Sequence, residues 1–219
     1  MQKGDVVAHL PFRGEWICLR PPGHHPHAMD FMKVDQRRKR YSGMPLLSYL
    51  FVGIPAKRFY SWGEPVLAPF DGVVVRVGEG WSDRKRASVV GTIRIWFTAT
   101  FLFRPKLDGS EIDIRPNVGN YVMVKSETGA VALLAHLRSS SVQVKVGQRV
   151  NTAQVIGKVG NSGNATAPHI HINLFDQVDD LLGAQVVPFT FIHYDRRNGR
   201  SWEAVENGIP QKQELVRSR

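Results

Sequence analysis

The sequence contains a single cysteine, Cys18, among its 219 residues. One cysteine excludes an intrachain disulfide and any zinc site built from several cysteines, so a metal must be held by histidine and carboxylate side chains. No apolar run reaches the roughly 18 residues of a membrane-spanning helix, so we expect no membrane span. Residues 1–5 lack the apolar segment of a signal peptide. We therefore expect a cytoplasmic location or release by a non-standard route.

Acidic residues are scarce relative to basic ones. The chain has 19 Asp and Glu against 29 Lys and Arg, a formal net charge of +10. Such a charge favours an anionic partner, whether nucleic acid, an anionic membrane face or an acidic cell-wall polymer, and does not choose among them. No recognition helix, zinc finger or aromatic RNA-binding motif is visible, so we expect no nucleic-acid partner. The sequence assigns no oligomeric state.

Short apolar runs separated by glycine and proline predict many turns and short strands. Alternating or apolar patterns predict strands at residues 6–10, 15–19, 28–32, 120–124, 131–137, 142–146 and 169–174. The Asp71-Gly72 pair between two apolar runs predicts a hairpin over residues 64–77. We expect residues 203–219 to form a polar, frayed tail.

The whole pattern predicts one mainly β, antiparallel domain over residues 1–219, with an insertion. Its parts would be a core at about 9–35 and 62–176, an insertion at about 81–116 and a C-terminal extension at about 177–219. Within the insertion, residues 89–103 are strongly apolar, and periodicity does not decide between a buried helix and two strands. This segment could also be an exposed surface for a partner or a membrane, but we favour core packing.

Two histidines occupy alternate positions in the segment His169-Ile170-His171-Ile172. Side chains two apart on a strand share a face, so both imidazoles point one way while the isoleucines point towards a core. This arrangement suits one metal ligand and one acid–base group. The alternative is a pair of surface histidines on an edge strand.

A second cluster of ligand-type side chains lies near the N-terminus. His24, His25 and His27 precede Asp30, which sits between apolar residues of an expected strand. An acid in that position is costly unless it is paired or coordinated. The alternative is a solvated, histidine-rich turn. His136 ends a third apolar strand.

These segments contain the groups that a catalytic zinc site needs. Such a site has three protein ligands and one open position, and a His, Asp and His set would supply the ligands. Two histidines would remain for proton transfer and for stabilising a tetrahedral intermediate. Zinc lowers the pKa of its water to about 7, so the set suits a hydrolase that acts on an amide.

Several motifs together resemble those of the lysostaphin-type (LytM-domain) zinc endopeptidases. Residues 160–171 resemble the closing motif of that family, 64–74 its hairpin, 134–137 its middle catalytic histidine segment and 146–150 the following turn. The resemblance covers roughly residues 11–35 and 62–175. It implies the lysostaphin/LytM (duplicated-hybrid-like) β-sandwich and one zinc ion per chain.

The resemblance also implies roles for individual residues. Asp30 and His171 would ligate zinc, and His136 and His169 would be the catalytic pair, acting as base and as stabiliser of the oxyanion. The common family pattern places the first histidine ligand four residues before the aspartate, where this chain has Pro26.

We therefore expect His25 to be the remaining ligand, with His24 the second choice and His27 the third. The implied reaction is hydrolysis of a peptide bond in bacterial peptidoglycan, in the cross-bridge or the stem, through a metal-activated water.

Two other functions compete with this hypothesis. One is a catalytically inactive LytM-like domain that binds cell wall or activates a partner hydrolase, which a metal-free protein would favour. The other is a carrier or phosphotransfer β domain, suggested by the hairpin at residues 68–72. That domain would need a modified lysine or a phosphohistidine, which mass spectrometry detects.

Overall fold

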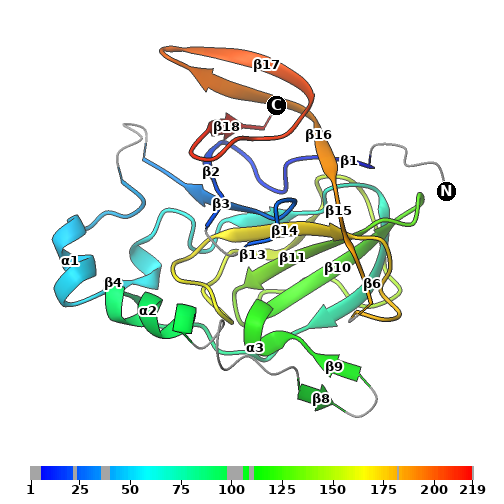
Figure 1. The fold of residues 1–219 in the computed structure, drawn as a ribbon, viewed down its shortest axis with the longest axis horizontal. Coiled ribbons are helices and arrows are strands. Elements are labelled where there is room, and N and C mark those ends of the chain that lie inside the picture. Colours follow the sequence, from blue (N-terminus) through cyan, green and yellow to red (C-terminus); the bar gives the residue numbers. More distant parts are fainter. Residues whose placement is uncertain are drawn as a thin grey trace.

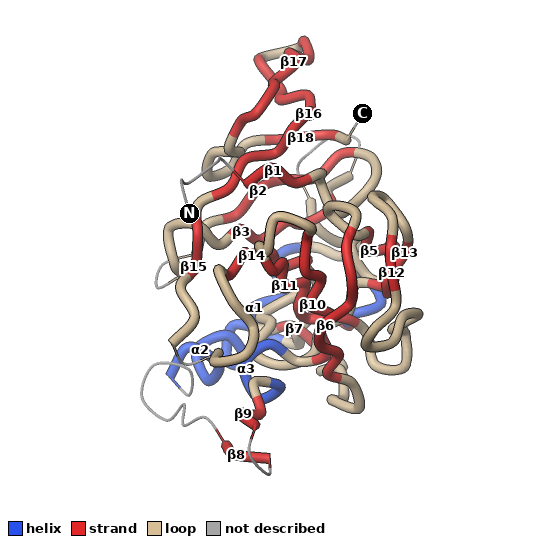
Figure 2. The backbone as a smooth tube through the Cα atoms, turned by 90° about the vertical axis from the view of Figure 1, so that its right-hand side faces the viewer, coloured by secondary structure: helices blue, strands red, loops and turns tan. Residues whose placement is uncertain are grey.

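The computed structural model describes residues 6–21, 24–35, 40–97, 106–108, 111–181 and 183–218. These residues form a mainly β protein with one large sheet, and the helices gather on one side of it (Figure 1). The tube view shows the strands of this sheet lying side by side, with the helices together near one end (Figure 2). The predicted mainly β class is therefore confirmed.

The elements follow one another along the chain with these bounds: β1 (Val6–Ala8), β2 (Glu15–Leu19), β3 (Met29–Lys33), α1 (Leu46–Phe51), β4 (Ile54–Pro55), the 3-10 helix η1 (Ala56–Arg58), β5 (Pro65–Leu67), β6 (Gly72–Gly78), β7 (Arg86–Ala87), α2 (Val89–Phe97), β8 (Lys106–Asp108), β9 (Glu111–Asp113), α3 (Arg115–Val118), β10 (Asn120–Ser126), β11 (Val131–Leu137), β12 (Arg149–Val150), β13 (Val155–Lys158), β14 (Ile170–Phe175), β15 (Val186–Val187), β16 (Phe189–Asn198), β17 (Ser201–Gly208) and β18 (Leu215–Arg217).

The large sheet has 12 strands, and its main order is β1-β16-β18-β2-β3-β14-β11-β10-β6-β12. Only β1 and β16 pair in parallel among the described strands of this sheet. Three central neighbours, β3, β14 and β11, carry Asp30, His171 and His136. In their register His171 lies opposite Asp30 on one side and Ala135 on the other.

A smaller layer formed by β5 and β13 completes the sandwich. Val66 and Ile156 of this layer are fully buried in the same apolar cluster as Trp16, Phe31 and Leu134 of the large sheet. Burying large apolar side chains between two layers is the main stabilising term, at roughly 1.5–3 kcal/mol for each. The sheet face that carries Phe31 therefore packs in the core, and its opposite face is left for the site.

The predicted hairpin over residues 64–77 is wrong. Strand β5 pairs with β13, whereas β6 pairs with β10 and β12. At the turn between β5 and β6, Oδ1 of Asp71 accepts hydrogen bonds from the backbone N–H and the hydroxyl of Thr152, at 2.6 and 2.7 Å. The Asp-Gly turn thus carries the chain from one layer to the other.

Two further expectations are also wrong. Residues 142–145 form no strand, and residues 203–219, expected to be a frayed tail, contain most of β17 and all of β18. Strand β18 lies between β2 and β16, where Val216 is fully buried opposite Trp16. This burial holds the C-terminal segment on the sheet although most of its residues are polar.

The insertion combines helices with short strands. Residues 81–116 contain β7, α2, β8, β9 and the start of α3, while part of the apolar segment, 98–103, lies outside the described residues. Core packing is the wrong expectation for α2, because Val90, Ile93 and Phe97 are 73%, 61% and 50% exposed. No helix in the described part of the chain has the length and apolar character needed to span a bilayer. That residues 1–219 form one domain stays a prediction.

Candidate metal and catalytic site

Asp30 and His171 meet at the centre of the large sheet because β3 and β14 place them opposite each other. The neighbours of Asp30 along β3, Met29 and Phe31, point into the core and are 1% and 0% exposed. Asp30 itself is 4% exposed on the other face. A carboxylate this deeply buried requires partners, and its Oδ1 lies 2.8 Å from Nδ1 of His171.

A third ligand-type side chain joins this pair. Ligand atoms of His24, Asp30 and His171 all lie within 4.8 Å of one another, and Nδ1 of His24 is 3.6 Å from Oδ2 of Asp30. The rings of His24 and His171 are in edge contact, with centroids 5.4 Å apart. The donor set is therefore nitrogen, oxygen and nitrogen, which zinc accepts.

The structure places His24 in this group, and not His25, which the sequence favoured. His25 instead faces His27, with ring centroids 5.4 Å apart and its Nδ1 accepting the backbone N–H of His27 at 3.2 Å. The chain turns here, because the N–H of Ala28 donates to the carbonyl of His25 at 2.9 Å. The turn directs His24 and His25 to different sides, and we propose His24 as the ligand in place of His25.

The two expected catalytic histidines lie next to the ligand group. The rings of His136 and His169 have centroids 4.6 Å apart, and those of His136 and His171 are 5.9 Å apart. Nε2 of His169 lies 3.5 Å from Oδ2 of Asp30. Four of the five expected site residues, Asp30, His136, His169 and His171, therefore lie together. His24 lies with them in place of the fifth, His25.

Backbone carbonyls fix the orientation of both rings. His136 Nδ1–H donates to the carbonyl of Ser162 at 2.9 Å, and His169 Nδ1–H donates to that of Ala167 at 2.7 Å. A carbonyl only accepts, so Nδ1 carries the proton and Nε2 is the free nitrogen of each neutral ring. Nε2 of His169 is buried, and the polar side-chain atom facing it is Oδ2 of Asp30, so this nitrogen points into the candidate metal group.

His171 is oriented by Asn173, two residues further along β14. Nε2 of His171 lies 3.0 Å from Oδ1 of Asn173, which is 4% exposed. An amide oxygen accepts only, so Nε2 carries the proton of this contact. Nδ1 on the other side of the ring faces the carboxylate of Asp30 at 2.8 Å, a distance at which the two atoms share either a proton or a cation.

Protonation of the site fits metal binding. Burial raises the pKa of the Asp30 carboxyl, but the neighbouring His169 and His171 outweigh burial and hold it well below its usual range. Burial lowers the pKa of His24 and, more strongly, that of His136. Metal ligation requires ionised carboxylates and neutral imidazoles, so Asp30 and His24 already have the required forms near neutral pH.

His169 differs from the other histidines of the site. Burial lowers its pKa, but the Asp30 carboxylate and the carbonyl of Ala167 outweigh burial and raise it above the ordinary value. The site thus combines a ring that is held neutral with a ring that holds a proton readily.

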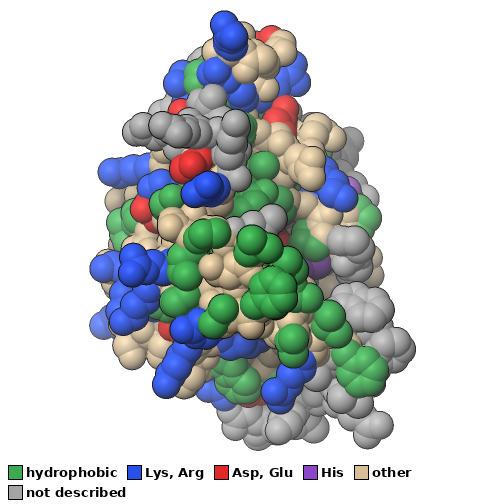
Figure 3. Space-filling view, turned by 90° about the vertical axis from the view of Figure 1, so that its left-hand side faces the viewer, with side chains coloured by type: hydrophobic (Ala, Val, Ile, Leu, Met, Phe, Trp, Pro, Cys, Tyr) green, Lys and Arg blue, Asp and Glu red, His purple; other side chains and the backbone are tan. Residues whose placement is uncertain are grey.

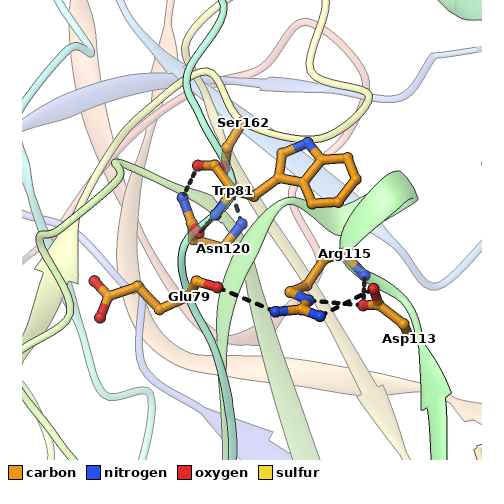
Figure 4. Close-up of polar contacts among 6 residues, drawn as sticks. All are labelled: Glu79, Trp81, Asp113, Arg115, Asn120 and Ser162. Carbon is orange, nitrogen blue, oxygen red and sulfur yellow. Dashed lines mark hydrogen bonds and ion pairs between the residues drawn. The ribbon is translucent and has the colours of Figure 1, made fainter. Parts of the chain in front are cut away.

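A polar network supports the loop that carries Ser162 (Figure 4). The hydroxyl of Ser162 donates to the carbonyl of Leu137 at 2.7 Å and accepts the backbone N–H of Asn120 at 2.9 Å. The Asn120 side chain in turn bonds both the N–H and the carbonyl of Trp81, each at 2.8 Å. Because the Ser162 carbonyl holds His136, this network fixes the position of that ring.

Sequence reasoning missed two supporting residues. Asp83 accepts the backbone N–H groups of Asn161 at 2.7 Å and Ser139 at 2.9 Å, although it lies 78 and 56 residues from them. No local pattern signals contacts over such separations. Asn173 was detectable, because its alternate position on the strand places it on the same face as His171.

Residues 108–181 match the family model described as Peptidase family M23. The matched segment contains His136, His169 and His171, whereas His24 and Asp30 lie outside it, Asp30 on β3 and His24 in the segment before β3. The resemblance predicted from the motifs is confirmed by this match.

Two characterised relatives share a segment of 59 residues, which is 27% of this chain. The peptidoglycan DD-endopeptidase ShyA of Vibrio cholerae is 41% identical over that segment, and the cell division protein DipM of Caulobacter vibrioides is 39% identical. The matches span 13% and 9% of the lengths of these relatives.

Solved structures of similar arrangement include two catalytic domains. One is a mutant of the prophage-encoded M23 protein EnpA from Enterococcus faecalis, 17% identical, with a TM-score of 0.42 over 83% of this chain and 87% of that chain. The other is lysostaphin from Staphylococcus simulans, 20% identical, with a TM-score of 0.40 over 80% of this chain and 88% of that chain.

Proposed function

We propose, on the premise that residues 108–181 are an M23 peptidase segment, that the protein is a zinc-dependent endopeptidase that hydrolyses peptide bonds of bacterial peptidoglycan. The observation that carries the proposal is the convergence of His24, Asp30 and His171 within 4.8 Å, beside the rings of His136 and His169. The substrate class is supported by a relative, ShyA, whose name is that of a peptidoglycan endopeptidase.

His24, Asp30 and His171 would hold the zinc ion. The fit is supported by the chemistry of the donor set, two imidazoles and one carboxylate, with Nδ1 of His171 and Oδ1 of Asp30 only 2.8 Å apart. When bound, zinc supplies a Lewis acid and makes hydroxide available near neutral pH. Three protein ligands leave one coordination position open, as a catalytic site requires.

His136 and His169 would move the protons of the reaction. Because the Nδ1–H of each ring is held by a backbone carbonyl, Nε2 is the only ring atom that can take up or release a proton. A neutral ring accepts a proton from the attacking water, and a ring protonated at Nε2 donates to the developing oxyanion or the leaving amine. The fixed rings also lower the entropy cost of these transfers.

The test is a digestion with a chemical readout. Zinc-loaded full-length protein is incubated with purified peptidoglycan and with short glycine and stem peptides, and the products are identified by mass spectrometry. We expect new amino termini at one type of peptide bond. His169→Ala should keep zinc and lose hydrolysis, whereas His171→Ala should lose both.

Circular dichroism checks that both variants are folded. If the wild-type protein holds zinc but releases no peptide from any of these substrates, the domain is a binding module and the peptidase proposal is wrong.

A further inference from the structure

Seven large apolar side chains lie exposed on the helices of the insertion and the preceding segment. They are Leu47, Leu50 and Phe51 of α1, Val52 directly after it, and Val90, Ile93 and Phe97 of α2, with exposures from 50% to 83%. We call this set the helical patch. Hydrophobic side chains gather on this side of the molecule, with Lys and Arg side chains around them (Figure 3). Single exposed apolar residues are ordinary, but a contiguous group marks an interaction site.

The helical patch is one preformed surface, because α1 and α2 are joined to each other. The hydroxyls of Tyr49 and Thr92 lie 2.6 Å apart, within hydrogen-bond distance. The guanidinium of Arg86 donates to the carbonyls of Val52 and Gly53 at 2.9 and 2.8 Å. These contacts fix the end of α1 against the segment that leads into α2.

The fold does not need the patch for its own packing. Beneath the helices a separate apolar cluster of Met32, Ile54, Phe59, Ala87 and Ala167 is already buried. Most of the outward side chains of α1 and α2 are apolar as well, with Arg94 as an exposed cation among them. A helix that is apolar on its outer side buries that side against something outside its own domain.

Charge indicates what covers the helical patch. Residues 40–63 and 84–97, which build this side, contain no Asp or Glu. Their exposed cations are Arg40, Lys57, Arg58, Lys85, Arg86 and Arg94. Apolar side chains in segments whose own charges are all positive complement an anionic bilayer, whose phosphates attract Lys and Arg while its acyl boundary accepts Phe, Leu and Ile.

We propose that the helical patch docks the protein on an anionic lipid bilayer. The apolar side chains enter the boundary between headgroups and acyl chains, and the cations lie at the phosphates. The patch shares its base with the candidate site, since Met32 under the helices is two residues from Asp30 on β3. Docking therefore brings the site close to the membrane surface. This inference stands whether or not the protein hydrolyses peptides.

Vesicle co-sedimentation of the full chain tests the proposal. The vesicles contain either phosphatidylcholine alone or equal parts of phosphatidylcholine and phosphatidylglycerol. We expect binding to the anionic vesicles only. The double variant Phe51→Ser/Ile93→Ser leaves the charge unchanged and should bind at least about tenfold more weakly, because two large side chains no longer enter the bilayer. Val146→Ser, which removes a side chain 61% exposed in a distant turn, should bind like the wild type.

A second pair of variants tests the electrostatic part of vesicle binding separately from the apolar part. Arg58→Gln/Arg94→Gln should weaken binding and make it less sensitive to salt, whereas Arg200→Gln in the β16–β17 turn should have little effect. Thermal melts establish that each variant is folded. If the double variant is unfolded, the single variant Phe51→Ser, at a position 83% exposed, replaces it in the assay.

Three results would overturn the proposal. They are the absence of wild-type binding to anionic vesicles, equal binding to neutral vesicles, and full binding by the folded serine variants. A dimer in vesicle-free solution that the serine variants convert to a monomer would show that a second copy covers the patch instead.

Discussion

The amide of Asn173 provides the sharpest test of how the proposed ligand His171 is held. Its Oδ1 accepts Nε2–H of His171 at 3.0 Å in a buried position, so it selects the tautomer that presents Nδ1 to the metal. Replacing an outer-shell partner of this kind costs about 10–100-fold in metal affinity. That range corresponds to about 1.4–2.7 kcal/mol. We expect this loss for Asn173→Leu, which keeps the volume and removes the acceptor.

The assay is competition for zinc with a chromogenic chelator near neutral pH. Asn173→Asp keeps an acceptor oxygen in place and should retain most of the affinity. Asn164→Ala removes a comparable amide contact, Nδ2 to Asn117 Oδ1 at 3.0 Å, away from the histidines and should leave zinc binding unchanged. If folded Asn173→Leu binds zinc as tightly as the wild type, Asn173 does not orient His171 and the reasoning fails.

Three further predictions concern the rest of the fold. Burial raises the pKa of the Cys18 thiol to about 12, so a thiol reagent at pH 8 should label Cys18 only after unfolding; rapid labelling of native protein would contradict this. Gly163 has φ +66° and a Cβ there would lie 2.2 Å from a backbone nitrogen, so Gly163→Ala should lower the free energy of unfolding by roughly 1–3 kcal/mol in urea titrations; a neutral effect would show that the loop yields. Asp83→Ala removes the acceptors of two backbone N–H groups and should lower the free energy of unfolding by about 1–3 kcal/mol in the same titrations. The control Asp179→Ala, on an exposed loop, should show no such loss.

Local patterns predicted most of the central sheet. Strands β2, β3, β10, β11 and β14 follow from short apolar or alternating runs, because the period of two is set by backbone geometry. The same rule placed His169 and His171 on one shared face. This part of the site could be predicted because residues at alternate positions of a strand point to the same side.

Features that depend on long-range contacts could not be predicted from the sequence. The Asp71-Gly72 turn is typical of a hairpin, but here Asp71 accepts hydrogen bonds from Thr152, and the chain passes from β5 in one layer to β6 in the other. The C-terminal strand β18 has three residues in a mostly polar segment, and Val216 is buried there against β2. Tertiary context overrides a local propensity in both cases.

The choice between His24 and His25 shows the same limit at the site. Both residues have the same chemistry and adjacent positions, so spacing alone could not separate them. In the structure the N–H of Ala28 donates to the carbonyl of His25, and the ring of His24 lies beside Asp30. Such a backbone turn is not encoded in the spacing of the histidines.

The most direct test of the account is the zinc content of His24→Ala compared with that of His25→Ala, measured by elemental analysis after zinc loading and dialysis. We predict about one zinc per chain in the wild type and in His25→Ala, and almost none in His24→Ala. Zinc retained by folded His24→Ala and lost from His25→Ala would contradict the proposed ligand set.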